Sequence, residues 1–307
     1  MKVAVVGAGH MGRLHAEKFA RCEGVALAAV VDRDEARARA LAQEHGCPAF
    51  TDFREILGLA DAAVVAVPTD RHYEVATACL ENGLHLLVEK PIAQSVEQAD
   101  RLIAAAERRG RVLQVGHVER WNKAFQALSA RMDRPVFVDA ERLAGFKQRG
   151  AEVDVVLDLM IHDLDLAVAL ARAEVREVSA CGFRVLTGDI DIANARLEFE
   201  NGCVANLSAS RVSQSPVRKF RVFQSDVYVS ADLQGGKLRY VRQVDGAIQE
   251  TDERHEGGDA LAAQAAAFVA AARGKRPVSL DGREGRRALA LALEIGRLVR
   301  ERLSRFA

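Results

Sequence analysis

Lys2-Val3-Ala4-Val5-Val6-Gly7-Ala8-Gly9-His10-Met11-Gly12 is the stretch that decides the fold of the first half of the chain. An apolar strand over 2–6 runs into three glycines spaced Gly-x-Gly-x-x-Gly, and a helical periodicity follows over 10–21. Gly7 permits a tight turn, Gly9 lets backbone approach a pyrophosphate, and Gly12 allows close packing of helix on strand. The start of the helix then offers unpaired N–H groups and a positive dipole end to phosphates. This stretch predicts a dinucleotide site.

A carboxylate at the end of the next strand supports the same prediction. The strand over 25–31 ends in Asp32, which follows Gly12 by 20 positions. From that place a carboxylate can accept hydrogen bonds from an adenosine ribose. Because it would repel a 2′-phosphate, we expect NAD rather than NADP, although Arg33 keeps NADP open as the less favoured cofactor.

Composition is that of a cytoplasmic enzyme. The 307 residues suffice for two domains. Because 43 basic residues balance 43 acidic ones, the chain has no net positive charge that would attract nucleic acid or an anionic membrane. We expect no membrane span and no export signal. An odd number of scattered cysteines predicts free thiols in a reducing compartment and no zinc site. These cysteines are Cys22, Cys47, Cys79, Cys181 and Cys203.

The first half alternates strand and helix. Apolar strands over 2–6, 25–31, 62–67, 84–89 and 112–116 enclose helical periodicities over 10–21, 34–44, 71–82 and 95–109. Strands that are apolar on both sides are typical of a parallel sheet covered on both faces. The fold class predicted for residues 1–119 is therefore a doubly wound α/β Rossmann domain.

The region after Trp121 changes character. A short helix over 122–131, a strand over 135–144 and a helix over 153–172 precede several alternating segments, which predict antiparallel strands. These segments cover 176–186, 193–199, 203–210, 217–223 and 226–232, and helices over 259–273 and 283–304 end the chain. Residues 120–282 are predicted to form a second α/β domain with an open, mainly antiparallel sheet, and helix 283–304 can pack back onto the first domain.

Six features in order resemble the Gfo/Idh/MocA oxidoreductases along nearly the whole chain. They are the glycine turn at 7–12, Asp32, Val67-Pro68-Thr69 with His72, Glu89-Lys90-Pro91, Val115-Gly116-His117, and Asp158-x-x-x-His162. The resemblance implies NAD(P)-linked alcohol–ketone redox, most often on sugars or cyclitols, with Lys90 and His162 as the catalytic pair. The candidate cofactor-binding residues are Gly7, Gly9, His10, Met11, Gly12, Asp32, Arg33, Pro68, Thr69, His72, Glu89 and Lys90.

The residue types suit that chemistry. Oxidising a secondary alcohol requires removal of the hydroxyl proton, for which the imidazole of His162 is suited. Asp158 lies four residues before His162 on the predicted helix, so it can orient the ring and stabilise the imidazolium. Lys90, at the carboxyl edge of the sheet, can hydrogen-bond the same hydroxyl and stabilise negative charge on its oxygen.

Plainer interpretations stay open at this point. Asp158, His162 and Asp165 could form a solvated stripe of an amphipathic helix. An Asp–His pair could bind a metal, but no convincing third ligand is present, so we expect none. Glu89 is either structural or in contact with the nicotinamide ribose, and His72 is expected to anchor a helix start rather than act as an acid.

The substrate is indicated by similarity to one branch of the family. The segments 115–122 and 158–165 resemble the branch that oxidises the 3-hydroxyl of UDP-N-acetylglucosamine, whose 3-keto product passes to an aminotransferase in the biosynthesis of lipid A and related polysaccharides. Arginine and lysine suit phosphate oxygens, although ordinary surface charge is an equal alternative for each. The candidate substrate-binding residues are His117, Arg120, Lys147, Arg149 and Arg211.

Two other functions remain. A dehydrogenase or reductase of a free sugar or cyclitol would use the same catalytic residues, and a non-catalytic NAD-binding sensor would keep the fold without the reaction. We also expect a homodimer or homotetramer, because one face of the second sheet needs a cover. The apolar residues proposed for that face are Val178, Leu197 and Leu207.

Overall fold

A parallel six-stranded sheet forms the centre of the first of two units in the computed structural model, which describes residues 1–147, 153–255 and 257–305. Its strand order is β3-β2-β1-β4-β5-β6. The strands are β1 (Lys2–Val6), β2 (Ala26–Val31), β3 (Ala49–Phe50), β4 (Ala62–Val65), β5 (His85–Glu89) and β6 (Leu113–Gly116). This order reverses between β1 and β4, and open α/β sheets bind ligands at such a switch point.

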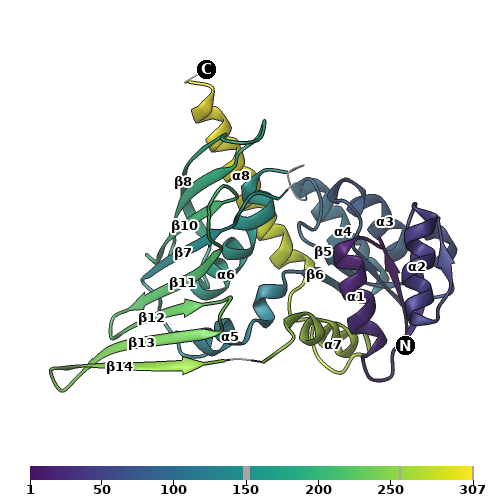
Figure 1. The fold of residues 1–307 in the computed structure, drawn as a ribbon, viewed down its shortest axis with the longest axis horizontal. Helices are drawn as coiled ribbons and strands as arrows, with labels where there is room; N and C mark the ends of the chain where they lie inside the picture. The colour runs from purple at the N-terminus through teal and green to yellow at the C-terminus, as the bar shows by residue number, and fades with distance from the viewer. Residues whose placement is uncertain (148–152, 256, 306–307) are drawn as a thin grey trace. The chain divides into compact units, whose positions relative to one another are not determined.

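Helices cover both faces of this sheet, as the doubly apolar strands require. They are α1 (His10–Ala20), α2 (Glu35–His45), α3 (Thr69–Glu81), α4 (Val96–Arg109) and α7 (Ala260–Ala272), with a 3₁₀ turn, η1, over Phe53–Ile56. Side chains from α1, α2 and α7 share one core with β1. The rings of Phe19 and Phe268 meet there edge to face at 6.0 Å, and Figure 1 shows α7 beside α1.

The two compact units comprise residues 1–118 with 259–289, and 119–258 with 290–307. The ranges 1–119 and 120–282 predicted from sequence differ in the place of α7, which packs on α1 in the first unit. An Ala-rich helix has no sequence feature that indicates which unit it packs against, so the boundary predicted from sequence leaves it in the second domain. Helix α8 (Gly282–Leu303) begins in the first unit, where Arg286 pairs with Asp100 at 2.6 Å.

The second unit is built on an eight-stranded sheet, ordered β14-β13-β12-β11-β7-β10-β9-β8 (Figure 1). Only β7 and β10 pair in parallel; the other neighbours are antiparallel. The strands are β7 (Phe137–Leu143), β8 (Val175–Phe183), β9 (Ile192–Phe199), β10 (Val204–Ser210), β11 (Val217–Gln224), β12 (Val227–Asp232), β13 (Lys237–Val244) and β14 (Ala247–Arg254). The helical elements are η2 (Val118–Trp121), α5 (Lys123–Ser129), a π-helical turn η3 (Val156–Met160) and α6 (Ile161–Ala171).

The hairpin of β13 and β14 was missed by the sequence prediction. Its strands are largely exposed, so they lack the apolar alternation that marks a half-buried strand. The signal that could have found it is Asp245-Gly246, two residues with positive φ that join Val244 to Ala247 in a tight turn.

The prediction of which residues line the open face of this sheet was wrong. Leu197 and Leu207 are fully buried, and Val178 pairs with Leu197, so all three lie on the covered face. The opposite face of β7 and β11 carries the aromatic contact between Phe137 and Phe223, with ring centroids 5.5 Å apart. A shift of one residue in a strand moves every side chain to the other face, so small errors of register invert such a prediction.

We predict that Phe268→Ala lowers the free energy of unfolding by about 3–5 kcal/mol, because a fully buried aromatic side chain would leave a cavity beside Phe19. Urea unfolding of the whole protein measures the loss. Phe183→Ala serves as the control, since Phe183 is 56% exposed and should cost under about 0.5 kcal/mol. Equal losses in the two variants would show that α7 is not part of the first core.

Candidate active site

The candidate residues of the first unit gather at one edge of the six-stranded sheet. Gly7 follows β1, Asp32 follows β2, Pro68 lies beyond β4, Lys90 follows β5 and His117 follows β6. All of these strands are parallel, so their carboxyl ends meet at the same edge. That is the edge where doubly wound folds bind ligands.

The glycine turn leaves no room for side chains except at its middle position. Gly7 has φ +102°, and a Cβ there would lie 2.4 Å from the carbonyl oxygen of Ala66. A Cβ at Gly12 would lie 1.7 Å from the Gly7 carbonyl oxygen, whereas a Cβ at Gly9 would meet nothing within 4 Å. Gly9 is also the N-cap of α1, and no side chain among the described residues caps that helix. The first amides of α1 therefore face open space at Gly9, which fits a pyrophosphate.

Asp32 is held in place by backbone amides. Its Oδ2 accepts a hydrogen bond from Ala8 N at 2.7 Å and its Oδ1 accepts one from Asp34 N at 2.9 Å. Each carboxylate oxygen keeps capacity for a second donor, so a ribose diol can still bind. The next side chain, Arg33, is exposed, as is His10, while Met11 is half-buried at the start of α1.

Lys90 follows a carboxylate that is buried in the domain. Glu89 Oε1 lies 2.7 Å from His15 Nε2, and its Oε2 accepts a hydrogen bond from Lys90 N at 3.3 Å. Burial alone would raise the pKa of Glu89, but the hydrogen bond from His15 and the positive charge of Lys90 lower it overall. Both carboxylate contacts favour a structural role for Glu89. The Lys90–Pro91 peptide bond is cis.

His72 anchors the start of α3, as predicted. Its Nδ1 lies 2.8 Å from the carbonyl oxygen of Pro91, and its Nε2 lies 2.9 Å from that of Val67. The ring thus joins the chain after Lys90 to the chain before Pro68 and Thr69. Burial lowers the pKa of His72, although both carbonyl oxygens favour the charged ring.

In the second unit, His162 lies half-buried in the first turn of α6, directly after the π-helical turn that contains Asp158. Single π turns within helices recur at functional sites. At the start of the π-helical turn, Asp154 accepts hydrogen bonds from Val156 N and Leu157 N at 3.0 and 2.9 Å.

Two buried ion pairs, at Asp163 and Asp165, fix α6 just after His162. Asp163 receives two hydrogen bonds from Arg142, at 2.9 and 2.8 Å, and Arg142 also bonds Glu119 at 2.9 Å. Asp165 receives two from Arg120, at 2.6 and 3.0 Å. Asp165 is buried, so the solvated-stripe interpretation is wrong for that residue.

The candidate substrate-binding residues differ in their surroundings. Lys147 is exposed, His117 is buried, and Arg149 lies outside the described residues. Arg120 is engaged by Asp165, and the buried Arg211 donates to the carbonyl oxygen of Val153 at 2.5 Å. Lys147 is therefore the most accessible of the described basic candidates.

Sequence reasoning missed His15 and the charged cluster around Arg142. His15 follows Gly12 by three positions, on the face of α1 that Gly12 brings against the sheet, and this spacing was the available signal. Arg142 and Glu119 gave no such signal, because an isolated charge in a strand or turn does not reveal a partner far away in sequence.

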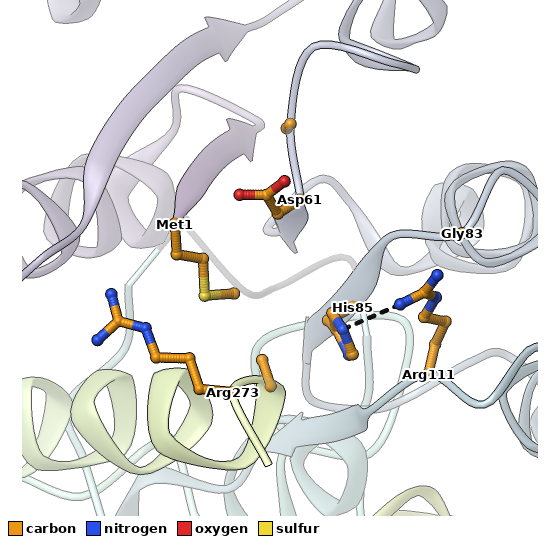
Figure 2. Close-up of a pocket in the computed structure, with 8 residues that line it drawn as sticks. Met1, Asp61, Gly83, His85, Arg111 and Arg273 are labelled. Carbon is orange, nitrogen blue, oxygen red and sulfur yellow. Dashed lines mark hydrogen bonds between the residues drawn. The ribbon is translucent and has the colours of Figure 1, made fainter. Parts of the chain in front are cut away.

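A pocket of about 490 Å³ lies at the amino edge of the first sheet, away from these residues (Figure 2). It is lined by residues that precede or begin strands, among them Asp61 and His85, and by Arg111 and Arg273. Figure 2 shows Arg111 beside the His85 ring, whose Nδ1 accepts Val112 N at 3.0 Å. His85 thus packs beside its own strand, and the pocket contains none of the candidate site residues.

Within the described ranges, no three histidine, cysteine or carboxylate side chains are grouped as metal ligands. No helix in the part of the chain that the structure describes is long and apolar enough to cross a membrane.

The glycine turn and Asp32 of the first unit have the arrangement of a dinucleotide site, and comparison with known proteins gives the family. The family model described as "Oxidoreductase family, NAD-binding Rossmann fold" (GFO_IDH_MocA) matches residues 1–117, and the Gfo/Idh/MocA C-terminal domain matches 125–229. The chain belongs to the Gfo/Idh/MocA family and is an NAD-dependent oxidoreductase.

Individual relatives support this assignment. The chain is 41% identical to UDP-N-acetylglucosamine 3-dehydrogenase of Acidithiobacillus ferrooxidans over 96% of both chains. A solved structure of that enzyme matches with a TM-score of 0.92 over 97% of both chains. The chain is also 30% identical to scyllo-inositol 2-dehydrogenase (NAD(+)) of Bacillus subtilis, over 69% of this chain and 68% of that enzyme.

We predict that Asp32→Asn weakens NAD binding by about 10- to 100-fold, because a charge-assisted bond to the ribose is lost. Binding of NADP should weaken less or improve, since the repulsion of a 2′-phosphate is removed. Calorimetric titration of each variant with both cofactors measures the ratio. Asp34→Asn, which removes an equal charge from the neighbouring cap of α2, should leave the ratio unchanged; a similar shift there would contradict the role of Asp32.

Proposed function

We propose that the protein oxidises the 3-hydroxyl of UDP-N-acetylglucosamine to a ketone with NAD. The observation that carries this proposal is 41% identity, over nearly the full length, to an enzyme with that activity. Lys90, Asp158 and His162 supply the chemistry that the resemblance assigns to them. NAD, when bound, supplies the hydride acceptor.

In the proposed reaction, His162 accepts the hydroxyl proton as the general base. Asp158 orients the imidazole and stabilises its charged form. The Lys90 ammonium hydrogen-bonds the substrate oxygen and stabilises the negative charge that develops as the proton leaves. The bidentate bonds at Asp163 and Asp165 hold α6 firmly, which supports a fixed position for the base.

Lys147 and Arg149 are our leading candidates for binding the diphosphate. Their charges suit phosphate oxygens, and the side chain of Lys147 is exposed. Arg120 and Arg211 are weaker candidates, because each already bonds to protein oxygen atoms. His117, beyond the end of β6, is proposed to contact the sugar rather than the phosphates.

The second candidate is a dehydrogenase of a free cyclitol, favoured by the 30% identity to scyllo-inositol 2-dehydrogenase. The catalytic residues would be the same, so the nucleotide is what separates the two substrates. A non-catalytic NAD sensor is disfavoured by the presence of Lys90, Asp158 and His162.

We further propose a homodimer or homotetramer in the cytoplasm. The open face of the eight-stranded sheet carries Phe223, which contacts Phe137 and Tyr228, and this aromatic cluster supports a protein partner on that face. A ketone formed on an amino sugar is a substrate for transamination, so an aminotransferase in lipid A biosynthesis is the proposed next enzyme.

We predict NADH formation when the protein, NAD and UDP-N-acetylglucosamine are mixed with a carbonyl trap, measured by absorbance. Lys147→Ala should raise KM for the nucleotide sugar by about 5- to 20-fold with little change in kcat, because a phosphate contact contributes mainly to binding. Lys275→Ala, a change at an exposed lysine of the first unit, is the control. Turnover of scyllo-inositol but not of the nucleotide sugar would favour the second candidate, and silence with both, despite NAD binding, would favour the sensor.

We predict that the oxidation rate falls as acid pH protonates His162, because the charged ring cannot accept the substrate proton. His162→Asn should lower kcat by about 100- to 10,000-fold, the usual contribution of a general base. Initial rates over the pH range of stable protein measure both effects. A rate indifferent to acid pH and to the substitution would exclude this role.

A further inference from the structure

His15 makes a contact that the proposed reaction does not yet use. It lies on α1, is fully buried, and its Nε2 is 2.7 Å from Glu89 Oε1. The bond joins the helix that follows the glycine turn to the end of β5, two strands away from β1 in the sheet. A polar link of this kind is made at a cost of desolvation, so a purely apolar pair would serve core packing as well.

The geometry assigns the proton of this bond. Within the described residues, His15 Nδ1 has no hydrogen-bond partner, so the ring places its hydrogen on Nε2, toward the carboxylate. The carboxylate also packs closely against Gly116, because a Cβ at that position would lie 2.9 Å from its atoms. His15 and Gly116 therefore both limit the positions that the Glu89 carboxylate can take.

The position of the Glu89 carboxylate affects the next residue, Lys90. Glu89 Oε2 accepts the backbone N–H of Lys90 at 3.3 Å, and the negative charge of Glu89 acts on the ammonium group. Beyond Lys90, His72 contacts the carbonyl oxygen of Pro91 at 2.8 Å. The residues on either side of Lys90 are thus each contacted by a buried histidine, Glu89 by His15 on α1 and Pro91 by His72 on α3.

We propose that His15 is a positioning residue for Lys90, acting through Glu89. This inference rests on the proposed function, because it requires Lys90 to act on the substrate. It extends that function by linking the helix that binds the cofactor phosphates to the group that binds the reacting oxygen. The effect is on kcat, since a misplaced ammonium group fails to stabilise charge that develops during the reaction.

The test compares His15→Leu, which removes the donor, with His15→Gln, whose amide places an N–H at a similar reach. We expect His15→Leu to lower kcat by about 10- to 100-fold while KM for NAD changes less than about 3-fold, and His15→Gln to restore most of the rate. Gln114→Leu is the matched control, another fully buried polar side chain of the same domain, and should leave kcat unchanged.

A double-mutant cycle separates positioning from general destabilisation. In a Lys90→Ala protein, His15→Leu should lower the residual kcat less than about 3-fold, because residues that act through one group are not additive. Hydrogen exchange of the cofactor-free protein gives a second readout. His15→Leu should accelerate exchange at the amide of Lys90, and Gln114→Leu should not.

The outcomes distinguish the two proposals. If Lys90→Ala lowers kcat but His15→Leu does not, or if His15→Leu costs as much without Lys90 as with it, the positioning role is overturned. If Lys90→Ala retains the full rate, the catalytic assignment of the proposed function fails, and the exchange data alone show whether His15 holds the Lys90 backbone. If His15→Leu instead changes KM for NAD strongly while kcat stays constant, His15 supports cofactor binding by α1 and does not position Lys90.

Discussion

The close approach of α1 to β1 is the constraint on which the first domain depends. Because the Gly7 carbonyl oxygen leaves no room for a Cβ at Gly12, the helix lies against the sheet directly from its first turn. This approach directs the amides at Gly9 toward a phosphate site and brings His15 within hydrogen-bonding distance of Glu89. One packing constraint therefore shapes both the proposed phosphate site at Gly9 and the proposed support of Lys90.

The two domains hold their catalytic candidates by the same means. Lys90 directly follows Glu89, and His162 directly precedes Asp163; both carboxylates are buried and bonded by a basic side chain from another element. Burial of a charge is costly unless its partner is fixed, so each pair allows few alternative arrangements. Burial raises the pKa of Asp163, and its bonds to Arg142 act in the opposite direction. Such pairs contribute positional precision more than stability.

Local signals carried most of the sequence prediction. The glycine spacing, Asp32 and the doubly apolar strands predicted the parallel sheet, and regular alternation predicted most strands of the second sheet. The sequence prediction failed where contacts between distant segments determine the structure. The sequence of α7 shows no preference for a partner, and the exposed β13–β14 hairpin lacks apolar alternation. The register of β9 and β10 places Leu197 and Leu207 on the covered face. Each depends on which distant segment packs against it, and a periodicity does not contain that information.

Arginine illustrates the same limit at the site. A guanidinium group binds a carboxylate and a phosphate with the same planar fork, so sequence alone does not tell a substrate ligand from a structural one. The sequence predicts a diphosphate ligand at Arg120, yet this residue bonds Asp165 through two nitrogens, while Arg142 joins Glu119 to Asp163. What separates a structural arginine from a substrate ligand is the presence of carboxylates near it in the fold. The three carboxylates here, Glu119, Asp163 and Asp165, are buried, and each is distant in sequence from the arginine that it bonds. We therefore propose that specificity for a nucleotide resides in basic groups whose charge the protein itself does not already neutralise, which favours the exposed Lys147 over the buried arginines as a substrate ligand.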